Sequence, residues 1–347
     1  MAVVTVQGEI NSSLLGYVLA HEHILSDLRP LVVPYPEIGR MNVFNQKVIL
    51  ENHGLLTRNP YSVLDNAVLN EEDVQTAEVL EYKKAGGDTI VDVTTREFGR
   101  DPQFLYGLSR VTGLNIVAGC GYYLGAMHPP EVTELPVNKL ADKIILELNE
   151  GMDGTNIRAG VIGEVGTSEV ISPGEYKSLE AASNAQEETG CGMHIHACLW
   201  NRNGIDAMKF AVKHGAEAKK ICIDHVDVVL DMGYIEGILK LGAYVEFDDF
   251  GKEFYVDRRY RNMLYTSFAT DRERVMRIKE LIDKGYIEQI LISNDICLKT
   301  LTHKYGGWGY DHILTNILPM MIDYGITTEH ANTILKINPA CFLDRTR

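Results

Sequence analysis

Residues 17–23 read YVLAHEH, a short apolar run that ends in a His-Glu-His triplet. The apolar run is typical of a buried strand. Open nucleotide-binding α/β sheets place a glycine-rich GxGxxG turn after their first strand, whereas this chain places histidines and a carboxylate there. The stretch therefore favours a closed (β/α)8 TIM barrel, which carries its chemistry at the carboxyl ends of its strands, over an open doubly wound sheet.

Further apolar runs follow along the chain, rich in Val and Ile and mostly continuous rather than alternating. Such runs are typical of parallel strands that are buried on both faces. With the first run, the predicted strands cover residues 17–20, 89–94, 115–121, 159–166, 192–197, 221–226, 243–248 and 289–295. This number of strands, each followed by a helical stretch, predicts an α/β fold of the TIM-barrel type.

Amphipathic stretches between the runs predict the helices. The clearest covers residues 271–284, with a capping-box pair at Thr270 and Glu273 and Gly285 where the helix should end. Pro319 should kink or shorten the last helix. The other predicted helices cover residues 72–85, 101–112, 137–150, 175–189, 204–214, 229–241 and 310–324.

Two connections are long, residues 24–71 after the first strand and residues 248–270 after the seventh. Long loops in a compact domain are usually lids or binding loops, and both of these follow strands at the catalytic face of a barrel. No internal repeat or linker interrupts the pattern. Residues 1–347 are therefore expected to form one domain.

The composition is that of a globular protein with an acidic balance. The 347 residues include 33 Lys and Arg against 48 Asp and Glu, a net charge of −15. This balance argues against nucleic acid or an anionic membrane as partner. Six cysteines without CxxC spacing indicate reduced thiols, and no signal-peptide pattern or long apolar run is present. We expect a cytoplasmic protein whose partner is a small-molecule substrate.

Histidines gather at the ends of the predicted strands. His21 and His23 are two residues apart on one strand, so their side chains point the same way. His225 ends the sixth run, and the fifth offers His194 or His196, between which the spacing does not choose. A single such histidine is more often structural. Several at equivalent positions of a barrel converge on one mouth.

Two carboxylates complete this pattern, Glu164 at the end of the fourth strand and Asp295 at the end of the eighth. A buried carboxylate needs either a cation or hydrogen-bond donors, and an Arg or Lys partner is the alternative to a metal. Imidazole and carboxylate together are ligands of zinc and similar divalent metals. The set exceeds the needs of one tetrahedral ion. We therefore predict two ions with a carboxylate bridge that generate hydroxide, with Asp295 as the catalytic proton acceptor.

Ordered segments along nearly the whole chain resemble the phosphotriesterase-related proteins of the amidohydrolase superfamily. They are LGYVLAHEH (15–23), AGGDTIVDVTTREFGRDP (85–102), LSRVTGLNIVAGCGYYLGAMHP (108–129), AGVIGEVGTSE (159–169), ETGCGMHIHA (188–197), ICIDHVD (221–227), KGYIEQILISND (284–295) and INPACFL (337–343). The resemblance implies a (β/α)8 barrel that is a hydrolase with a binuclear metal centre, and it favours a homodimer.

The resemblance also implies a ligand set for each ion. The more buried ion would be held by His21, His23 and Asp295. The more exposed ion would be held by His196 and His225, which leaves His194 as a structural or outer residue.

Glu164 departs from the best-known members of the family, which carry a lysine that CO2 converts into a bridging carbamate. A subgroup that includes animal proteins resembles this chain in having glutamate at that position. The implied cofactor is a pair of divalent ions bridged by Glu164 and a hydroxide, with zinc expected and manganese as an alternative.

The resemblance implies hydrolysis of lactones, phosphotriesters or amides. Our leading expectation is a lactone or carboxylic ester of a small polar metabolite. The alternatives are an amidase for N-acyl amino or sulfonic acids and a phosphotriester hydrolase. Tyr123 and Arg258 are the candidate substrate-binding residues. A binding protein without catalysis is the contrasting class, and the filled ligand positions argue against it.

Overall fold

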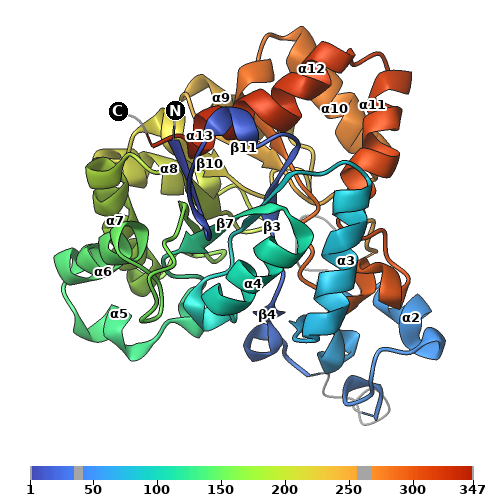
Figure 1. The fold of residues 1–347 in the computed structure, drawn as a ribbon, viewed down its shortest axis with the longest axis horizontal. Helices are drawn as coiled ribbons and strands as arrows, with labels where there is room; N and C mark the ends of the chain where they lie inside the picture. The colour runs from blue at the N-terminus through green and yellow to red at the C-terminus, as the bar shows by residue number, and fades with distance from the viewer. Residues whose placement is uncertain (1, 35–41, 256–266, 346–347) are drawn as a thin grey trace.

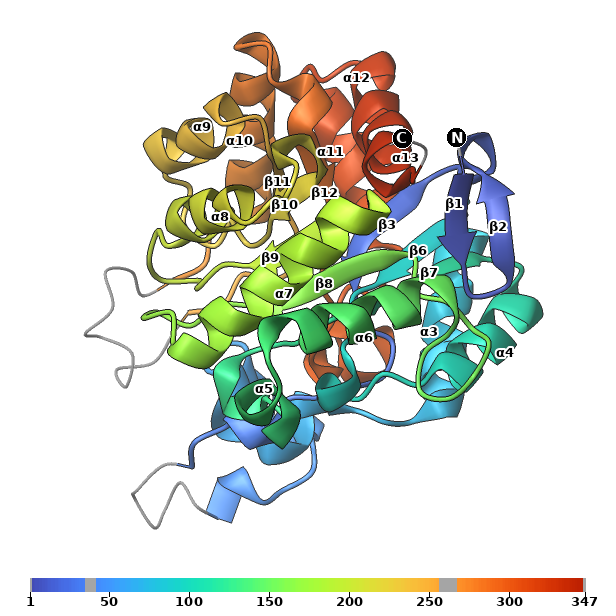
Figure 2. The same ribbon diagram turned by 90° about the vertical axis from the view of Figure 1, so that its left-hand side faces the viewer.

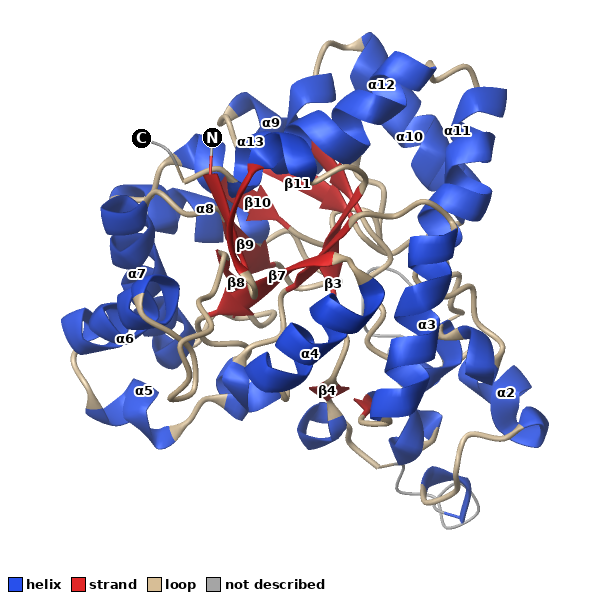
Figure 3. Ribbon diagram, in the orientation of Figure 1, coloured by secondary structure: helices blue, strands red, loops and turns tan. Residues whose placement is uncertain are grey.

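A computed structural model describes residues 2–34, 42–255 and 267–345. Eight parallel strands form one sheet that curves into a barrel with helices around it (Figures 1 and 3). The strands are β3 (Val18–Glu22), β6 (Thr89–Asp92), β7 (Asn115–Cys120), β8 (Val161–Gly166), β9 (Met193–His196), β10 (Ile221–Ile223), β11 (Tyr244–Phe247) and β12 (Ile290–Ile292). The (β/α)8 barrel predicted from the sequence is confirmed.

The strands follow one another around the barrel in chain order, from β3 to β12. The two edge strands meet where the backbone amide of Asp295 donates to the carbonyl of His21 at 3.2 Å. Each predicted run contains one strand, and β3 continues two residues beyond its predicted end, through His21 to Glu22. His21, the first candidate ligand, therefore lies within the first strand of the barrel.

The helices around the barrel include all those predicted. They are α3 (Glu72–Lys84), α4 (Pro102–Thr112), α6 (Val137–Asn149), α7 (Pro173–Thr189), α8 (Gly204–Lys213), α9 (Met232–Lys240), α10 (Asp271–Asp283) and α11 (Leu318–Asp323). The capping box of Thr270 and Glu273 is present at the start of α10. A π-helical segment (Ile313–Ile317) precedes α11, whose first turn contains Pro319, so the regular α-helix is shorter than the predicted stretch of residues 310–324.

The amino-terminal end of the barrel is closed by elements that the sequence did not predict. A hairpin of β1 (Ala2–Thr5) and β2 (Gly8–Asn11) lies beside helix α13 (Asn338–Leu343), which follows α12 (Thr328–Asn332) along the chain. Val3 and Phe342 pack against strand residues such as Val161. The first and last described residues lie side by side (Figure 2), and the backbone nitrogen of Ala2 donates to Asp344 Oδ1 at 2.9 Å.

The opposite end of the barrel carries the two long loops. The first contains the paired strands β4 (Ser26–Asp27) and β5 (Val68–Leu69) and helix α2 (Leu50–Leu56). A short helix, α5 (Pro130–Glu134), lies before α6. The described part of the second loop closes with a bridge between Tyr255 and Ser267. None of the described helices combines the length and the apolar character needed to span a lipid bilayer.

Candidate metal centre

The six predicted ligands converge at the carboxyl ends of the strands. They are His21, His23, Glu164, His196, His225 and Asp295. His225 lies two residues beyond β10 and Asp295 three residues beyond β12. Both have positive φ angles, of 59° and 46°, a conformation that is uncommon outside glycine. Backbone bonds hold both residues there. The amide of His225 donates to Asp248, and that of Asp295 donates to His21.

The side chains of the His-Glu-His triplet point alternately to the two faces of the strand, as expected. His21 and His23 face the barrel interior, whereas Glu22 turns toward the loop after β12. Its carboxylate accepts hydrogen bonds from Ser293 Oγ at 2.7 Å and from the amide of Ile296 at 2.8 Å. Glu22 therefore fixes the seam between the first and last strands and leaves the two imidazoles free for the centre.

Glu164 lies between two groups of donor atoms. Its Oε1 is 3.1 Å from His23 Nε2, which is itself 3.2 Å from Asp295 Oδ1. Its Oε2 is 2.9 Å from His196 Nδ1 and 3.6 Å from His225 Nε2. Oε1 thus faces His23, whereas Oε2 faces His196 and His225 and also lies 3.8 Å from His21 Nε2. This is the position that a bridging ligand between two cations would take.

The way in which the histidine nitrogens and carboxylate oxygens pair with one another indicates that the centre suits cations. His21 Nε2 is buried without a hydrogen-bond partner, although it faces Glu164 and Asp295 at 3.8 Å each. His196 Nδ1 and His225 Nε2 approach to 2.8 Å, where only one nitrogen can donate. Burial lowers the pKa of His23, but hydrogen bonds to Asp295 and Glu164 outweigh it and raise the pKa to about 10. These residues fit a pair of divalent ions.

Hydrogen bonds behind the donors fix their orientation. His23 Nδ1 pairs with Thr94 Oγ1 at 2.9 Å, and His225 Nδ1 pairs with Asp248 Oδ1 at 3.0 Å. Such contacts select the ring nitrogen that faces a metal. On the other side, the buried ammonium of Lys252 contacts Asp295 Oδ2 and lies 2.9 Å from Asp249 Oδ1. Lys252 therefore holds Asp295 Oδ2, whereas Oδ1 faces His21 and His23.

The centre opens into a cavity of about 250 Å³ that both long loops help to line. Its walls are mainly apolar and include Leu28, Tyr61, Phe98, Trp200 and Phe268. Tyr123 lies in the wall with its hydroxyl 3.4 Å from His196 Nδ1. The hydroxyl of the neighbouring Tyr122 donates to Glu131. Arg258, the other predicted substrate contact, lies outside the described residues.

Sequence reasoning missed several acidic residues around the centre. Asp224, Glu246 and Asp248 are buried and contact candidate ligands or their neighbours. Each stands within or next to an otherwise apolar strand, which is an unusual place for a carboxylate. That signal was visible in ICID and YVEFD, but the sequence alone does not identify their partners.

The fold and the site define a class of protein, namely (β/α)8 barrels that gather imidazoles and carboxylates at their strand ends around positions suited to divalent metals. The model of the phosphotriesterase family matches residues 1–343. The chain belongs to the phosphotriesterase family, and it is a hydrolase.

The chain is also similar to individual relatives and solved structures. An N-acetyltaurine hydrolase from Danio rerio is 37% identical over 98% of this chain and 97% of its own length. A solved resiniferatoxin-binding protein from Rhodobacter sphaeroides is 33% identical with a TM-score of 0.95, covering 99% of this chain and 95% of that one. A variant of a phosphotriesterase-like lactonase from Deinococcus radiodurans is 27% identical with a TM-score of 0.75, covering 99% and 100%.

Proposed function

We propose that the protein is a metal-dependent amidase that cleaves N-acyl derivatives of small amino or sulfonic acids. The observation that carries the choice of an amide is the 37% identity to an N-acetyltaurine hydrolase over nearly the full length of both chains. This reverses the order of the two leading expectations from the sequence. Hydrolysis of a lactone or carboxylic ester is the second candidate, supported by the 27% identity to a lactonase.

The two donor groups at the centre would each hold one ion, with Glu164 between them. When bound, the ions would supply an activated water at neutral pH and polarise the carbonyl oxygen of the substrate. Zinc is the metal that we propose, since the donors are imidazole nitrogens and carboxylate oxygens. Manganese is the alternative.

Asp295 is the proposed proton carrier. Its Oδ1 faces His23 at 3.2 Å, and its Oδ2 is held by Lys252. A carboxylate in this position can take a proton from the attacking water and return it to the departing amine, which needs one to leave. The contact between Lys252 and Oδ2 restrains rotation of the carboxylate. Oδ1 therefore stays turned toward the centre for both proton transfers.

The apolar walls of the cavity support a substrate with an apolar acyl group. Phe98, Trp200 and Phe268 line the space above the donor atoms, and such walls favour binding through burial of apolar surface. A six-carbon acyl chain should therefore be cleaved with a lower KM than an acetyl group. This differs from the small polar metabolite expected from the sequence.

The test compares N-acetyl and N-hexanoyl derivatives of taurine and glycine with a six-carbon lactone, in the presence of added zinc. Amide cleavage is followed by amine release, and lactone opening by a pH indicator. We expect kcat/KM for the best amide to exceed that for the lactone at least tenfold. The reverse ratio would overturn the amidase proposal. Asp295→Asn should reduce both activities at least about 100-fold; full activity would remove Asp295 from its proposed role.

A further inference from the structure

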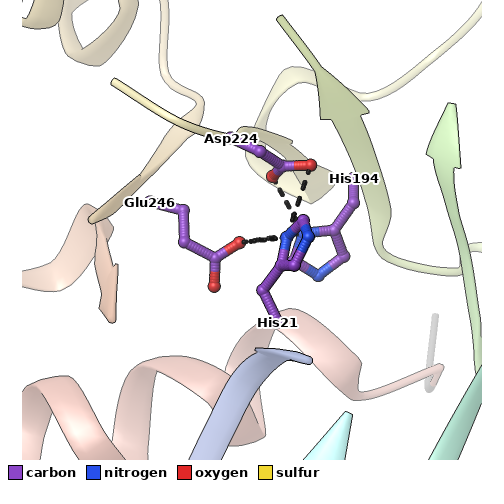
Figure 4. A group of neighbouring side chains, drawn as sticks. All are labelled: His21, His194, Asp224 and Glu246. Atoms are coloured by element: carbon purple, nitrogen blue, oxygen red, sulfur yellow. Dashed lines mark hydrogen bonds and ion pairs between the residues drawn. The ribbon is translucent and has the colours of Figure 1, made fainter. Parts of the chain in front are cut away.

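A second buried cluster lies directly behind His21. It consists of His21 itself, His194, Asp224 and Glu246, which come from β3, β9, the end of β10 and β11 (Figure 4). His21 Nδ1 is 3.3 Å from Glu246 Oε2. His194 Nδ1 is 2.9 Å from Asp224 Oδ1 and 3.1 Å from the same Glu246 oxygen. All four side chains are buried.

The ring of His21 therefore faces two environments. Its Nε2 points to the proposed metal centre, while the partners of its Nδ1 among the described residues are carboxylate oxygens. Beyond Glu246, these are Asp248 Oδ2 at 3.5 Å and Asp224 Oδ2 at 3.7 Å. A neutral imidazole carries one proton, on one of its nitrogens. Acceptors around Nδ1 place the proton there, and the lone pair of Nε2 is then directed at the centre.

The cluster also has the spacing of a cation site, because its four donor atoms lie within 4.8 Å of one another. Asp224 Oδ2 is buried without a hydrogen-bond partner. An ion there would need the Nδ1 lone pair of His21, and an ion at the first centre needs its Nε2 lone pair. The ring would have to lose both protons to serve both ions. A neutral His21 bound to one ion avoids this requirement.

We propose that Glu246, supported by Asp224 and His194, is a positioning residue that acts on the metal centre through His21. It accepts the Nδ1 proton of His21, fixes the ring orientation and so sets the affinity for the ion held by His21, His23 and Asp295. His194 bonds to both carboxylates and keeps Glu246 in place. This inference rests on the proposed function, since it requires a metal at the centre.

The test measures the two metal dissociation constants of the metal-free protein by competition of zinc with a chromophoric chelator. Glu246→Met removes the acceptor for the His21 proton and should weaken one constant about 10- to 100-fold, with the other changed by less than about threefold. Glu246→Gln keeps an acceptor oxygen and should recover much of the loss. Glu78→Gln is the matched control, because Glu78 is a buried carboxylate that accepts backbone amides of residues 303 and 304.

Three results would overturn the inference. In the first, Glu246→Met folds and both constants stay unchanged. In the second, the wild-type protein binds three zinc ions and the variant loses the third, which would make the cluster a metal site of its own. The third result applies if Glu246→Met does not fold. Asp224→Asn should then weaken the same dissociation constant at least threefold, and an unchanged dissociation constant in that variant would overturn the inference. Wild-type protein that binds no metal would instead reject the proposed function itself.

Discussion

Replacing Glu164 by glutamine tests the proposed bridge with the smallest change in shape. Oε1 lies 3.1 Å from His23 Nε2 and Oε2 lies 2.9 Å from His196 Nδ1, so both oxygens are in use. A carboxamide keeps one acceptor oxygen and presents an NH2 group, which has only donors, to the other side. One of the two donor groups therefore loses its acceptor oxygen, and the other keeps only a neutral carbonyl oxygen in place of an anionic one.

The size of the effect follows from the burial of this carboxylate, which is 1% exposed. Removing one partner of a buried charged pair costs about 3–5 kcal/mol. Since each 1.4 kcal/mol corresponds to about a factor of ten, we expect one ion to bind about two to three and a half orders of magnitude more weakly. The variant should retain one ion after dialysis, and kcat should fall at least about 100-fold.

The assay is metal content by mass spectrometry after dialysis, together with steady-state kinetics at saturating zinc. Glu175→Gln is the control, because Glu175 is a buried carboxylate that caps α7 and bonds to Gly125 and Ser168 rather than to a candidate ligand. The control should keep two ions. A Glu164→Gln protein with two ions and wild-type kcat would refute the bridging role.

Three further predictions address the metal, the proton carrier and acid stability. Chelation should abolish activity, and zinc alone should restore it without bicarbonate, because Glu164 supplies the bridge directly; strict dependence on bicarbonate in reconstitution would contradict this. Lys252→Gln should lower kcat at least about tenfold with a smaller change in KM, since Asp295 Oδ2 loses its buried ammonium partner; kinetics with an unchanged kcat would argue against that role. Burial raises the pKa of Asp271, but the hydrogen bond from His312 and the charge of Arg274 outweigh it and hold the pKa below the ordinary value of 3.8. The carboxylate therefore stabilises the fold above pH 3.8, and this stabilisation is lost as the pH falls through the lowered pKa of the folded state. In urea unfolding, Asp271→Asn should cost about 1–3 kcal/mol at pH 7, with the difference from wild type narrowing below pH 3.8; a gap that is constant with pH would count against the reasoning.

The barrel was predictable because each strand is buried on both faces and therefore forms a continuous apolar run. The elements at the amino-terminal end were not. The hairpin of residues 2–11 and the helices of residues 328–343 are short, and their role comes from packing across the barrel opening. Val3 and Phe342 meet Val161 there, although the three are far apart in the sequence. Short elements of this kind have no strong periodicity of their own.

The positions of the candidate ligands at strand ends predicted that they would lie together. Those positions did not predict which of them face Glu164 and which lie in the cluster behind His21. His194 and His196 both face inward, because residues two apart on a strand share a side. The structure places His196 Nδ1 beside Glu164 and His194 Nδ1 beside Asp224. Glu246, which contacts Nδ1 of His21 behind the proposed metal centre, is 225 residues away in the chain. No local pattern reports a pairing of that separation.

The closed end of the barrel makes the chain suitable for circular permutation. Ala2 N and Asp344 Oδ1 are 2.9 Å apart, on the side of the strands opposite the cavity. A short linker between the two ends would make the backbone circular, and new ends could then be opened in an outer loop. Because the histidines and carboxylates meet through the barrel rather than along the chain, such a permuted protein should assemble the same pocket. We therefore expect the chemistry of the pocket to be independent of the order in which the strands are synthesised.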